Sequence, residues 1–268
     1  MDNVMNAWWL WCVEQLPMWL APNLVTVIGL VFMMFSYFIM LPFDTTFEKE
    51  VPGWILIISV IFQFVNQTLD AVDGKQARRT GSSSPLGMLL DHGSDSLTTT
   101  ILILTLVQGV ALGKAYYLVT SILCIQGVFY FAAWEEYHLK MTRTQIGVFG
   151  VTEGQFMHMA VIITSAVAGA GFFHDNYALG FSFAQWTIAG NAAFAILMVS
   201  SVMIDNWKKC PNPLQSYLDL LPFVLQQGFL ACWAKTSLFD DYTWQIVIVQ
   251  GFVFSKMVIK LLICACGE

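Results

Sequence analysis

The sequence contains few charged residues. Only 11% of its 268 residues are Asp, Glu, Lys or Arg, whereas 57% are hydrophobic. A soluble domain normally carries about 25% charged residues, so the scarcity argues against a soluble globule and indicates an integral membrane protein. Basic residues are also outnumbered by acidic ones, 12 to 18. No basic stretch is available to neutralise a phosphate backbone, which argues against a nucleic-acid partner.

Cysteine is also sparse and lacks a metal-binding pattern. The six cysteines are scattered, and most fall in apolar segments, where they are expected to behave as small buried hydrophobic residues. Cys264 and Cys266 are too isolated to form a zinc site, which needs about four ligands.

Long apolar stretches dominate the chain and have the length of a membrane-spanning helix. They predict an all-α, polytopic membrane bundle with spans near residues 23–41, 53–78, 86–113, 115–137, 153–173, 186–206, 218–238 and 243–266. The opening segment carries several tryptophans around Glu14, and tryptophan favours the headgroup level of a bilayer. We therefore expect an N-terminal interfacial amphipathic helix over residues 1–22 and one transmembrane domain over residues 23–268.

The basic residues of the loops are unevenly divided between the two sides of the predicted bundle. The connections after the second, fourth and sixth spans hold or adjoin seven basic residues, and the other connections hold three. The positive-inside rule places the first set in the cytoplasm. That set comprises Lys75, Arg78, Arg79, Lys140, Arg143, Lys208 and Lys209.

Four carboxylates lie close together between residues 70 and 95, with apolar segments on both sides. Asp70 and Asp73 are three residues apart, and Asp91 and Asp95 are four apart, so each pair shares a helix face. Carboxylates at membrane depth are costly and usually mark a functional cavity. Two such pairs facing each other would form an oxygen-rich site for Mg²⁺ or Mn²⁺, with room for two ions, that can hold a diphosphate.

The same run fills every fixed position of the pattern D-x2-D-G-x2-A-R-x8-G-x3-D-x3-D, with Asp70, Asp73, Gly74, Ala77, Arg78, Gly87, Asp91 and Asp95. This pattern resembles the signature of the CDP-alcohol phosphotransferase family. The resemblance implies that a hydroxyl attacks the phosphorus that bears the small alcohol, with CMP leaving. It also implies that Gly74, Ala77 and Gly87 line the cytidine pocket. Arg78 is expected to contact a phosphate oxygen, whereas Arg79, Lys75 and Lys140 are expected to be interfacial cations.

His92 lies between Asp91 and Asp95, and it shares a helix face with positions 88 and 95. It is therefore a candidate general base toward the attacking hydroxyl. The segment 85–95 resembles the eukaryotic choline/ethanolamine phosphotransferase branch, in which the histidine of Asp-His-Gly is the proton acceptor. That branch usually has an acidic residue where this chain has Met88. Either His92 is a weaker base here, or another carboxylate assists it, and the candidates are Asp95, Glu135, Glu136 and Glu153.

Two further segments resemble the same branch. Residues 21–26, Ala-Pro-Asn-Leu-Val-Thr, match the start of its first span, and the resemblance implies that Asn23 contacts the CDP-alcohol. Residues 152–155, Thr-Glu-Gly-Gln, match a second segment. Members of the branch usually continue beyond the last span found here, so the chain is expected to be C-terminally truncated or a compact variant.

The resemblance implies transfer of phosphocholine or phosphoethanolamine from CDP-choline or CDP-ethanolamine to diacylglycerol. The products would be phosphatidylcholine or phosphatidylethanolamine, and CMP. The expected location is the membrane of the endoplasmic reticulum or Golgi, with the active site facing the cytoplasm. The expected partners are the CDP-alcohol, diacylglycerol and the lipid bilayer, and a homodimer is compatible with this interpretation.

Two alternatives stay open. An enzyme that uses CDP-diacylglycerol, with inositol, glycerol phosphate or serine as acceptor, would share the signature. A cation transporter would instead use the aspartates to line an ion path, although Arg78 fits poorly in an acidic path. Metal-dependent release of CMP would separate the transporter from both enzymes.

Overall fold

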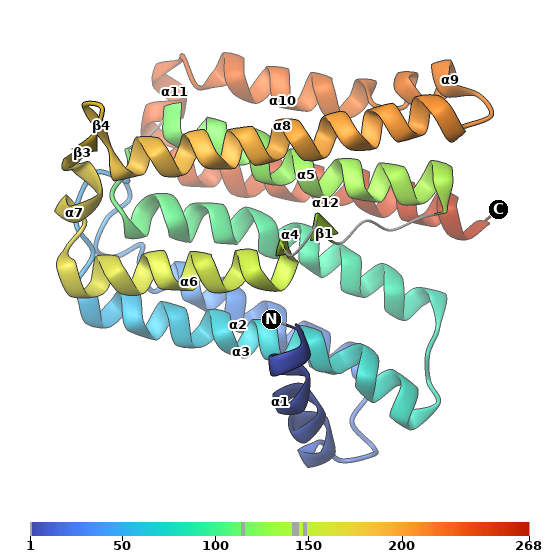
Figure 1. Cartoon of the computed structure of the whole chain (residues 1–268). Coiled ribbons are helices and arrows are strands. Elements are labelled where there is room, and N and C mark those ends of the chain that lie inside the picture. The colour runs from blue at the N-terminus through green and yellow to red at the C-terminus, as the bar shows by residue number, and fades with distance from the viewer. Residues whose placement is uncertain (1, 114–115, 141–144, 147–148, 268) are drawn as a thin grey trace.

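A computed structural model describes residues 2–113, 116–140, 145–146 and 149–267. The described chain is almost entirely helical (Figure 1), with the helices α1 (Asp2–Gln15), α2 (Pro22–Phe38), α3 (Gly53–Thr80), α4 (Pro85–Gly109), α5 (Tyr116–Leu139), α6 (Val151–Ala168), α7 (Gly171–His174), α8 (Phe183–Lys209), α9 (Pro213–Leu218), α10 (Leu221–Trp233), α11 (Ser237–Asp241) and α12 (Thr243–Gly267). Two very short antiparallel hairpins complete it: β1 (Gln145–Ile146) pairs with β2 (Phe149–Gly150), and β3 (Asn176–Ala178) pairs with β4 (Phe181–Ser182). The predicted all-α membrane bundle is confirmed.

A helix occupies each of the eight predicted spans, but the helices differ in their capacity to cross a membrane. Within the described residues, α3, α5, α8 and α12 are long and apolar enough to do so. The apolar helix α2 has only 17 residues. Helix α10 has 13 residues, or about 20 Å at 1.5 Å per residue, against a hydrocarbon core of about 30 Å. Four full spans are therefore supported, together with shorter or less apolar helices in the same bundle.

Two predicted spans are interrupted, which corrects the sequence-based boundaries. The span predicted at 153–173 ends at Ala168, because Gly169 adopts a positive φ of 83° and stops α6. The span predicted at 218–238 ends at Trp233, and Thr236 then begins α11 by accepting a hydrogen bond from the Phe239 N–H.

The long helices run side by side, and α4 lies among α2, α5, α6 and α12 (Figure 1). Helix α2 packs on both α3 and α4, and α8 packs on α5. Helix α1 crosses the bundle obliquely and packs on the C-terminal part of α3. The C-terminal ends of α3, α5 and α8 lie at one end of the bundle, so basic residues of the predicted cytoplasmic set share that end.

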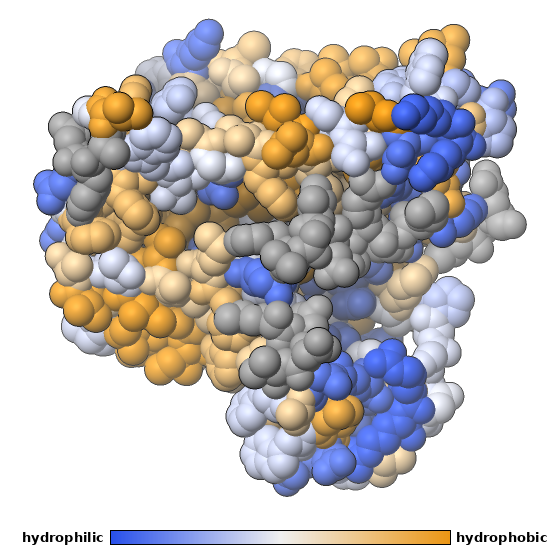
Figure 2. Space-filling view, in the orientation of Figure 1, coloured by the Kyte–Doolittle hydropathy of each residue, from blue (hydrophilic) through white to orange (hydrophobic). Residues whose placement is uncertain are grey.

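The surface has the polarity expected of a membrane protein. Figure 2 shows hydrophilic residues gathered at α1 and at the α8–α9 end, with apolar residues over the middle of the visible face. On α8, Ile196 and Leu197 are 66% and 68% exposed. Exposed aliphatic side chains in the middle of a long helix are stable against lipid, which agrees with an integral membrane protein.

The turn between α3 and α4 positions the region that carries the aspartates. Gly81 ends α3 in the left-handed conformation, with φ of 66° and ψ of 22°, which costs glycine little. Ser84 then caps α4, since its Oγ accepts a hydrogen bond from the Gly87 N–H at 3.1 Å, and Pro85 occupies the first turn. The chain therefore reverses within four residues, 81–84, and α4 returns past the C-terminal part of α3.

A buried polar network joins the centre of the bundle. The Gln126 amide on α5 pairs with Gln250 on α12, through donor–acceptor distances of 3.2 and 2.7 Å. Gln126 also donates to the Thr100 hydroxyl of α4 at 3.0 Å and accepts from Gln227 of α10 at 3.1 Å. A Cβ on Gly251 would lie 2.7 Å from the Thr100 side chain, so glycine allows α12 to approach α4 here.

Candidate functional site

Three carboxylates from two helices converge near the end of the bundle where α1 lies. One oxygen each from Asp70 of α3 and from Asp91 and Asp95 of α4 lie within 4.8 Å of one another. Each of these side chains is half-buried. Three anionic groups at this separation repel one another, and partial burial strengthens the repulsion. We call Asp70, Asp91 and Asp95 the acid cluster.

The donor set of the acid cluster fits a hard divalent cation. Mg²⁺ and Mn²⁺ prefer carboxylate oxygens, and a doubly charged ion would offset the mutual repulsion of the three groups. The predicted grouping of carboxylates across two helices is thus present for three of the four aspartates.

Asp73, the fourth predicted ligand, lies apart from that group and is held by α2. The Thr26 hydroxyl donates to Asp73 Oδ2 at 2.5 Å, a short charge-assisted hydrogen bond. Asp73 is 5% exposed, so this bond compensates part of the cost of burying its charge. Sequence reasoning did not single out Thr26. The available signal was its position three residues after Asn23, which places both on one face of a helix.

Asn23 and Gly87 come into contact where α2 and α4 begin. A Cβ on Gly87 would lie 3.3 Å from Asn23 Oδ1, so the asparagine side chain rests against the bare glycine backbone. The residues are 64 positions apart in the chain, and the structure brings two of the predicted nucleotide-binding positions together.

Gly74 and Arg78 also lie next to each other, one turn apart on α3. Arg78 Nη1 is 3.7 Å from the position that a Cβ on Gly74 would occupy. The guanidinium therefore lies back along the helix over Gly74. Gly74 and Arg78 are exposed, and Ala77 is half-buried.

His92 is half-buried on α4, directly after Asp91. Met88 lies one turn before it and is 37% exposed. Within the residues that the structure describes, no glutamate belongs to the acid cluster.

The three glutamates proposed to assist the base lie in different settings. Glu135 of α5 is 1% exposed, and Glu136 is half-buried. The Glu153 carboxylate accepts a hydrogen bond from the Gly150 N–H at 3.0 Å, which caps α6. A capping function therefore accounts for Glu153 locally.

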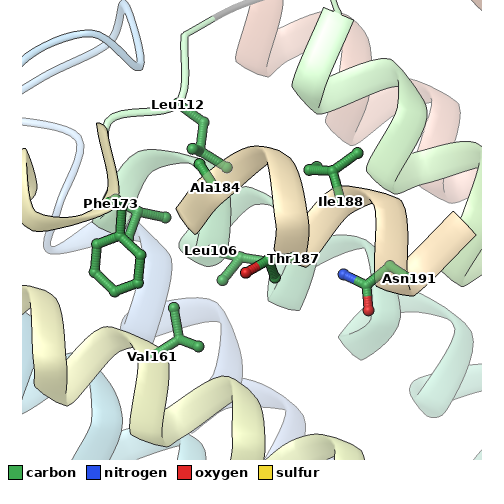
Figure 3. A pocket seen from close by; sticks show the side chains of 9 residues that line it. Leu106, Leu112, Val161, Phe173, Ala184, Thr187, Ile188 and Asn191 are labelled. Carbon is green, nitrogen blue, oxygen red and sulfur yellow. The ribbon is translucent and has the colours of Figure 1, made fainter. Parts of the chain in front are cut away.

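An apolar pocket lies deeper in the bundle, between α4, α6, α7 and α8 (Figure 3). Leu106, Val161, Phe173 and Ile188 line it, and the polar groups beside them are Thr187 and Asn191. Leu106 is 11 residues beyond Asp95 on α4, or about 16 Å along the helix axis. The pocket is thus distinct from the acid cluster.

Comparisons with known proteins agree with one another. Residues 19–197 match the family model described as CDP-alcohol phosphatidyltransferase. The chain is 33% identical over 263 residues to an uncharacterized CDP-alcohol phosphatidyltransferase class-I family protein of Dictyostelium discoideum, covering 94% of this chain and 62% of that protein. It is 36% identical over 277 residues to Cholinephosphotransferase 1 of Danio rerio, covering 96% and 70%. With Cholinephosphotransferase 1 of Saccharomyces cerevisiae it shares 39% identity over 137 residues, covering 51% and 35%. The chain therefore spans less than two thirds of the length of the Dictyostelium relative.

Proposed function

Because the chain belongs to the CDP-alcohol phosphatidyltransferase family, we propose that it transfers phosphocholine or phosphoethanolamine from the CDP-alcohol to the 3-hydroxyl of diacylglycerol. Phosphatidylcholine or phosphatidylethanolamine, and CMP, are the products. The observation that carries this proposal is the acid cluster, whose oxygens lie within 4.8 Å of one another beside the predicted nucleotide-binding residues. The relatives named Cholinephosphotransferase 1 favour phosphocholine as the transferred group.

Asp70, Asp91 and Asp95 would hold Mg²⁺ or Mn²⁺, and Asp73 would complete the ligand set for two ions. Bound metal supplies charge neutralisation for the diphosphate and for the CMP that leaves. The aspartates fix the place of that charge on two helices, and the Thr26 hydroxyl holds Asp73 in one orientation.

Asn23, Gly74, Ala77, Arg78 and Gly87 would bind the CDP-alcohol. Gly74 is exposed and leaves the backbone of α3 accessible to a cytidine ring, and Gly87 leaves room for the Asn23 side chain at the start of α4. Asn23 has an amide beside Gly87 for directed hydrogen bonds, and Arg78 supplies a planar cation for phosphate oxygens.

His92 would accept the proton of the attacking hydroxyl. Met88 cannot raise the basicity of His92 as a carboxylate would. Asp95, three residues away on α4, lies in the same helix as His92, so it is the best placed of the proposed assisting carboxylates. Glu135, Glu136 and Glu153 stay as further proposals for the assisting carboxylate or for headgroup binding.

The lipid acceptor would reach the site from the bilayer, and the nucleotide from the cytoplasm. The apolar residues around Leu106 and Ile188 (Figure 3) belong to the packed interior of the bundle, so the proposed lipid path is expected to run elsewhere along the helices. Basic residues at the end of the bundle that holds the acid cluster support a cytoplasmic orientation. We further propose the endoplasmic reticulum or Golgi as the location, and a homodimer as a compatible assembly.

CMP release by purified protein in detergent tests the proposal directly. CDP-choline and CDP-ethanolamine are offered separately with diacylglycerol, with Mg²⁺ or with a chelator. Release that requires both the metal and diacylglycerol is the expected result, and the preferred donor identifies the headgroup. Release only when CDP-diacylglycerol is combined with inositol, glycerol phosphate or serine would overturn the donor assignment. Binding of metal without CMP release from any of these donors would favour the transporter alternative.

A further inference from the structure

Two side chains of α3 fasten the segment that precedes α2. Arg79 Nη1 donates to the carbonyl oxygens of Val13 and Leu16, both at 2.7 Å. Gln76 Nε2 donates to the carbonyl oxygens of Pro17 and Leu20, at 3.0 and 3.1 Å. We call residues 13–20 the entry segment, since it leads the chain into α2. Arg79 is thus not only an interfacial cation, as the sequence suggested.

Two of the carbonyl groups that Arg79 and Gln76 contact already accept a backbone hydrogen bond, since the Leu16 N–H donates to Val13 at 3.2 Å and the Leu20 N–H donates to Pro17 at 3.1 Å, so the side chains supply a second donor there. Val13 lies in the last turn of α1, where a cation is favourable. Pro17 and Leu20 lie in the non-helical stretch after α1. Gln76 is 0% exposed. If its amide were removed, water could hydrogen-bond to these carbonyl groups only if α3 and the entry segment moved apart.

The entry segment determines where Asn23 lies. Only Ala21 and Pro22 separate Leu20 from Asn23, and the proline ring fixes one backbone torsion. Ala21 is extended, with φ of −65° and ψ of 133°, and α2 begins at Pro22. A shift of Leu20 is therefore passed to Asn23, whose side chain rests against Gly87.

The same turn of α3 faces the nucleotide site on its other side. Gln76 directly precedes Ala77 and follows Gly74 by two residues. The hydrophobic contact of Trp9 and Val13 with Val72 adds to the attachment, as does Lys75, whose Nζ lies 5.0 Å from the centre of the Trp9 ring. The same turn of α3 thus carries Gly74 and Ala77, which are proposed to bind the nucleotide, and Gln76, which holds the entry segment before Asn23.

We propose that Gln76 and Arg79 are positioning residues, which hold the entry segment so that Asn23 meets the nucleotide of the CDP-alcohol. This inference rests on the proposed function, because it assigns Asn23 to that substrate. The two residues would act through Asn23, since their hydrogen bonds go to the entry segment and to each other.

Gln108 provides a matched control for Gln76. It is also 0% exposed, and its amide also donates to two backbone carbonyl groups of a loop, those of Met40, at 3.1 Å, and Asp44. These contacts lie at the opposite ends of α2 and α4 from Asn23 and Gly87. Gln76→Leu and Gln108→Leu therefore remove equivalent hydrogen bonds, and only the first touches the entry segment.

Steady-state kinetics and equilibrium binding of CDP with Mg²⁺ are measured on both variants. We expect Gln76→Leu to raise the KM for the CDP-alcohol and the Kd for CDP about tenfold, equivalent to about 1.4 kcal/mol. The kcat and the KM for diacylglycerol should change by no more than about twofold. Gln108→Leu should lower the unfolding temperature similarly but leave the Kd for CDP unchanged. Equal effects of the two variants on the Kd would overturn the proposal.

A double-mutant cycle with Asn23→Ala tests whether Gln76 acts through Asn23. Once Asn23 is removed, Gln76→Leu should cost little further CDP affinity, so the two effects should be less than additive. Full additivity would overturn the proposal. Where Gln76→Leu does not fold, Arg79→Ala makes the same comparison, with Arg79→Lys expected to restore most of the affinity because it keeps a cationic donor.

Failure of the proposed function gives a different result from failure of the positioning inference. Wild-type protein that binds CDP but releases no CMP from CDP-choline or CDP-ethanolamine would contradict the proposed function. The comparison of Gln76→Leu with Gln108→Leu by CDP binding would still decide the positioning inference, because every donor of this family carries the same nucleotide.

Discussion

Asp91 is the residue on which the metal proposal depends most directly. It lies on α4 in the acid cluster, beside His92. We expect Asp91→Asn to lower CMP release by about a hundredfold or more, since changes even beyond the direct ligands commonly cost 10–100-fold. Asp175→Asn, at an exposed position after α7, is the control and should keep full activity.

Metal addition gives a second test of Asp91 that does not depend on turnover. Mg²⁺ should raise the unfolding temperature of the wild-type protein, because a ligand that binds only the folded state stabilises it. The increase should be small or absent in Asp91→Asn. Near-normal activity of this variant, with an undiminished response to Mg²⁺, would contradict the assignment of Asp91 as a metal ligand.

Thr26 holds Asp73 and was not predicted as a site residue. Thr26→Val keeps the shape but removes the hydrogen bond to a carboxylate that is 5% exposed. We expect a loss of about 1–3 kcal/mol in stability, together with weaker Mg²⁺ dependence of CMP release. Thr26→Ser keeps the hydroxyl and should restore both properties. Thermal unfolding measures the stability, and metal titration measures the Mg²⁺ dependence. Identical behaviour of Thr26→Val and Thr26→Ser would show that the hydroxyl contributes to neither property.

The acid cluster could be predicted from the sequence because its residues lie within 26 positions and follow helix spacing. The bond from Thr26 to Asp73 could not, since it joins residues 47 positions apart and depends on how α2 packs on α3. The hydrogen bonds of Gln76 and Arg79 could not be predicted from the sequence for a related reason. Their partners are backbone carbonyl groups, which leave no pattern in the sequence.

In the proposed site, the start of α4 would contribute to nucleotide binding through a missing side chain. A Cβ on Gly87 would lie 3.3 Å from Asn23 Oδ1, tighter than most contacts of a Cβ, so the Asn23 side chain would have to shift by a few tenths of an ångström. We expect Gly87→Ala to raise the KM for the CDP-alcohol several-fold, while the helix itself stays intact because alanine favours helices.

Gly127→Ala is the matched control for the change at Gly87. Gly127 lies within α5, and a Cβ there would meet nothing within 4 Å. This variant should keep the KM and should raise stability by about 0.5–1 kcal/mol, the usual gain for alanine over glycine in a helix. Kinetics that are equal for the two variants would contradict the proposed contact between Asn23 and the nucleotide.

Helix positions were predicted better than helix ends. The apolar stretches locate all the long helices, because hydrophobicity over many residues is a strong signal. The break after Ala168 depends on the single conformation of Gly169, and the break after Trp233 depends on a cap at Thr236. A single residue can end a helix inside a continuous apolar stretch, and the apolar pattern does not show where this happens.

At the scale of the whole molecule, the buried glutamine network joins α12 to the part of the chain that carries the site. Gln250→Leu would remove both of its bonds to Gln126, and we expect a loss of about 0.6–2 kcal/mol, the range for hydrogen bonds between membrane helices. Gln245→Leu on the same helix is the control, since none of the network bonds involves it. Unfolding in detergent measures the difference, and equal stability of the two variants would show that the network contributes nothing.

The network also imposes an order on the biogenesis of the protein. Gln126 can donate to Thr100, which is synthesised before it, but within the described residues its side-chain oxygen accepts from Gln227 and Gln250, which lie 101 and 124 residues later. At about 5–20 residues per second, the ribosome needs roughly 6–25 s to reach Gln250. Until Gln227 is made, the Gln126 oxygen lacks the partners that it has in the folded protein. Because an unsatisfied polar group is costly in hydrocarbon, we expect water or another polar partner to satisfy that oxygen until α10 and α12 are made.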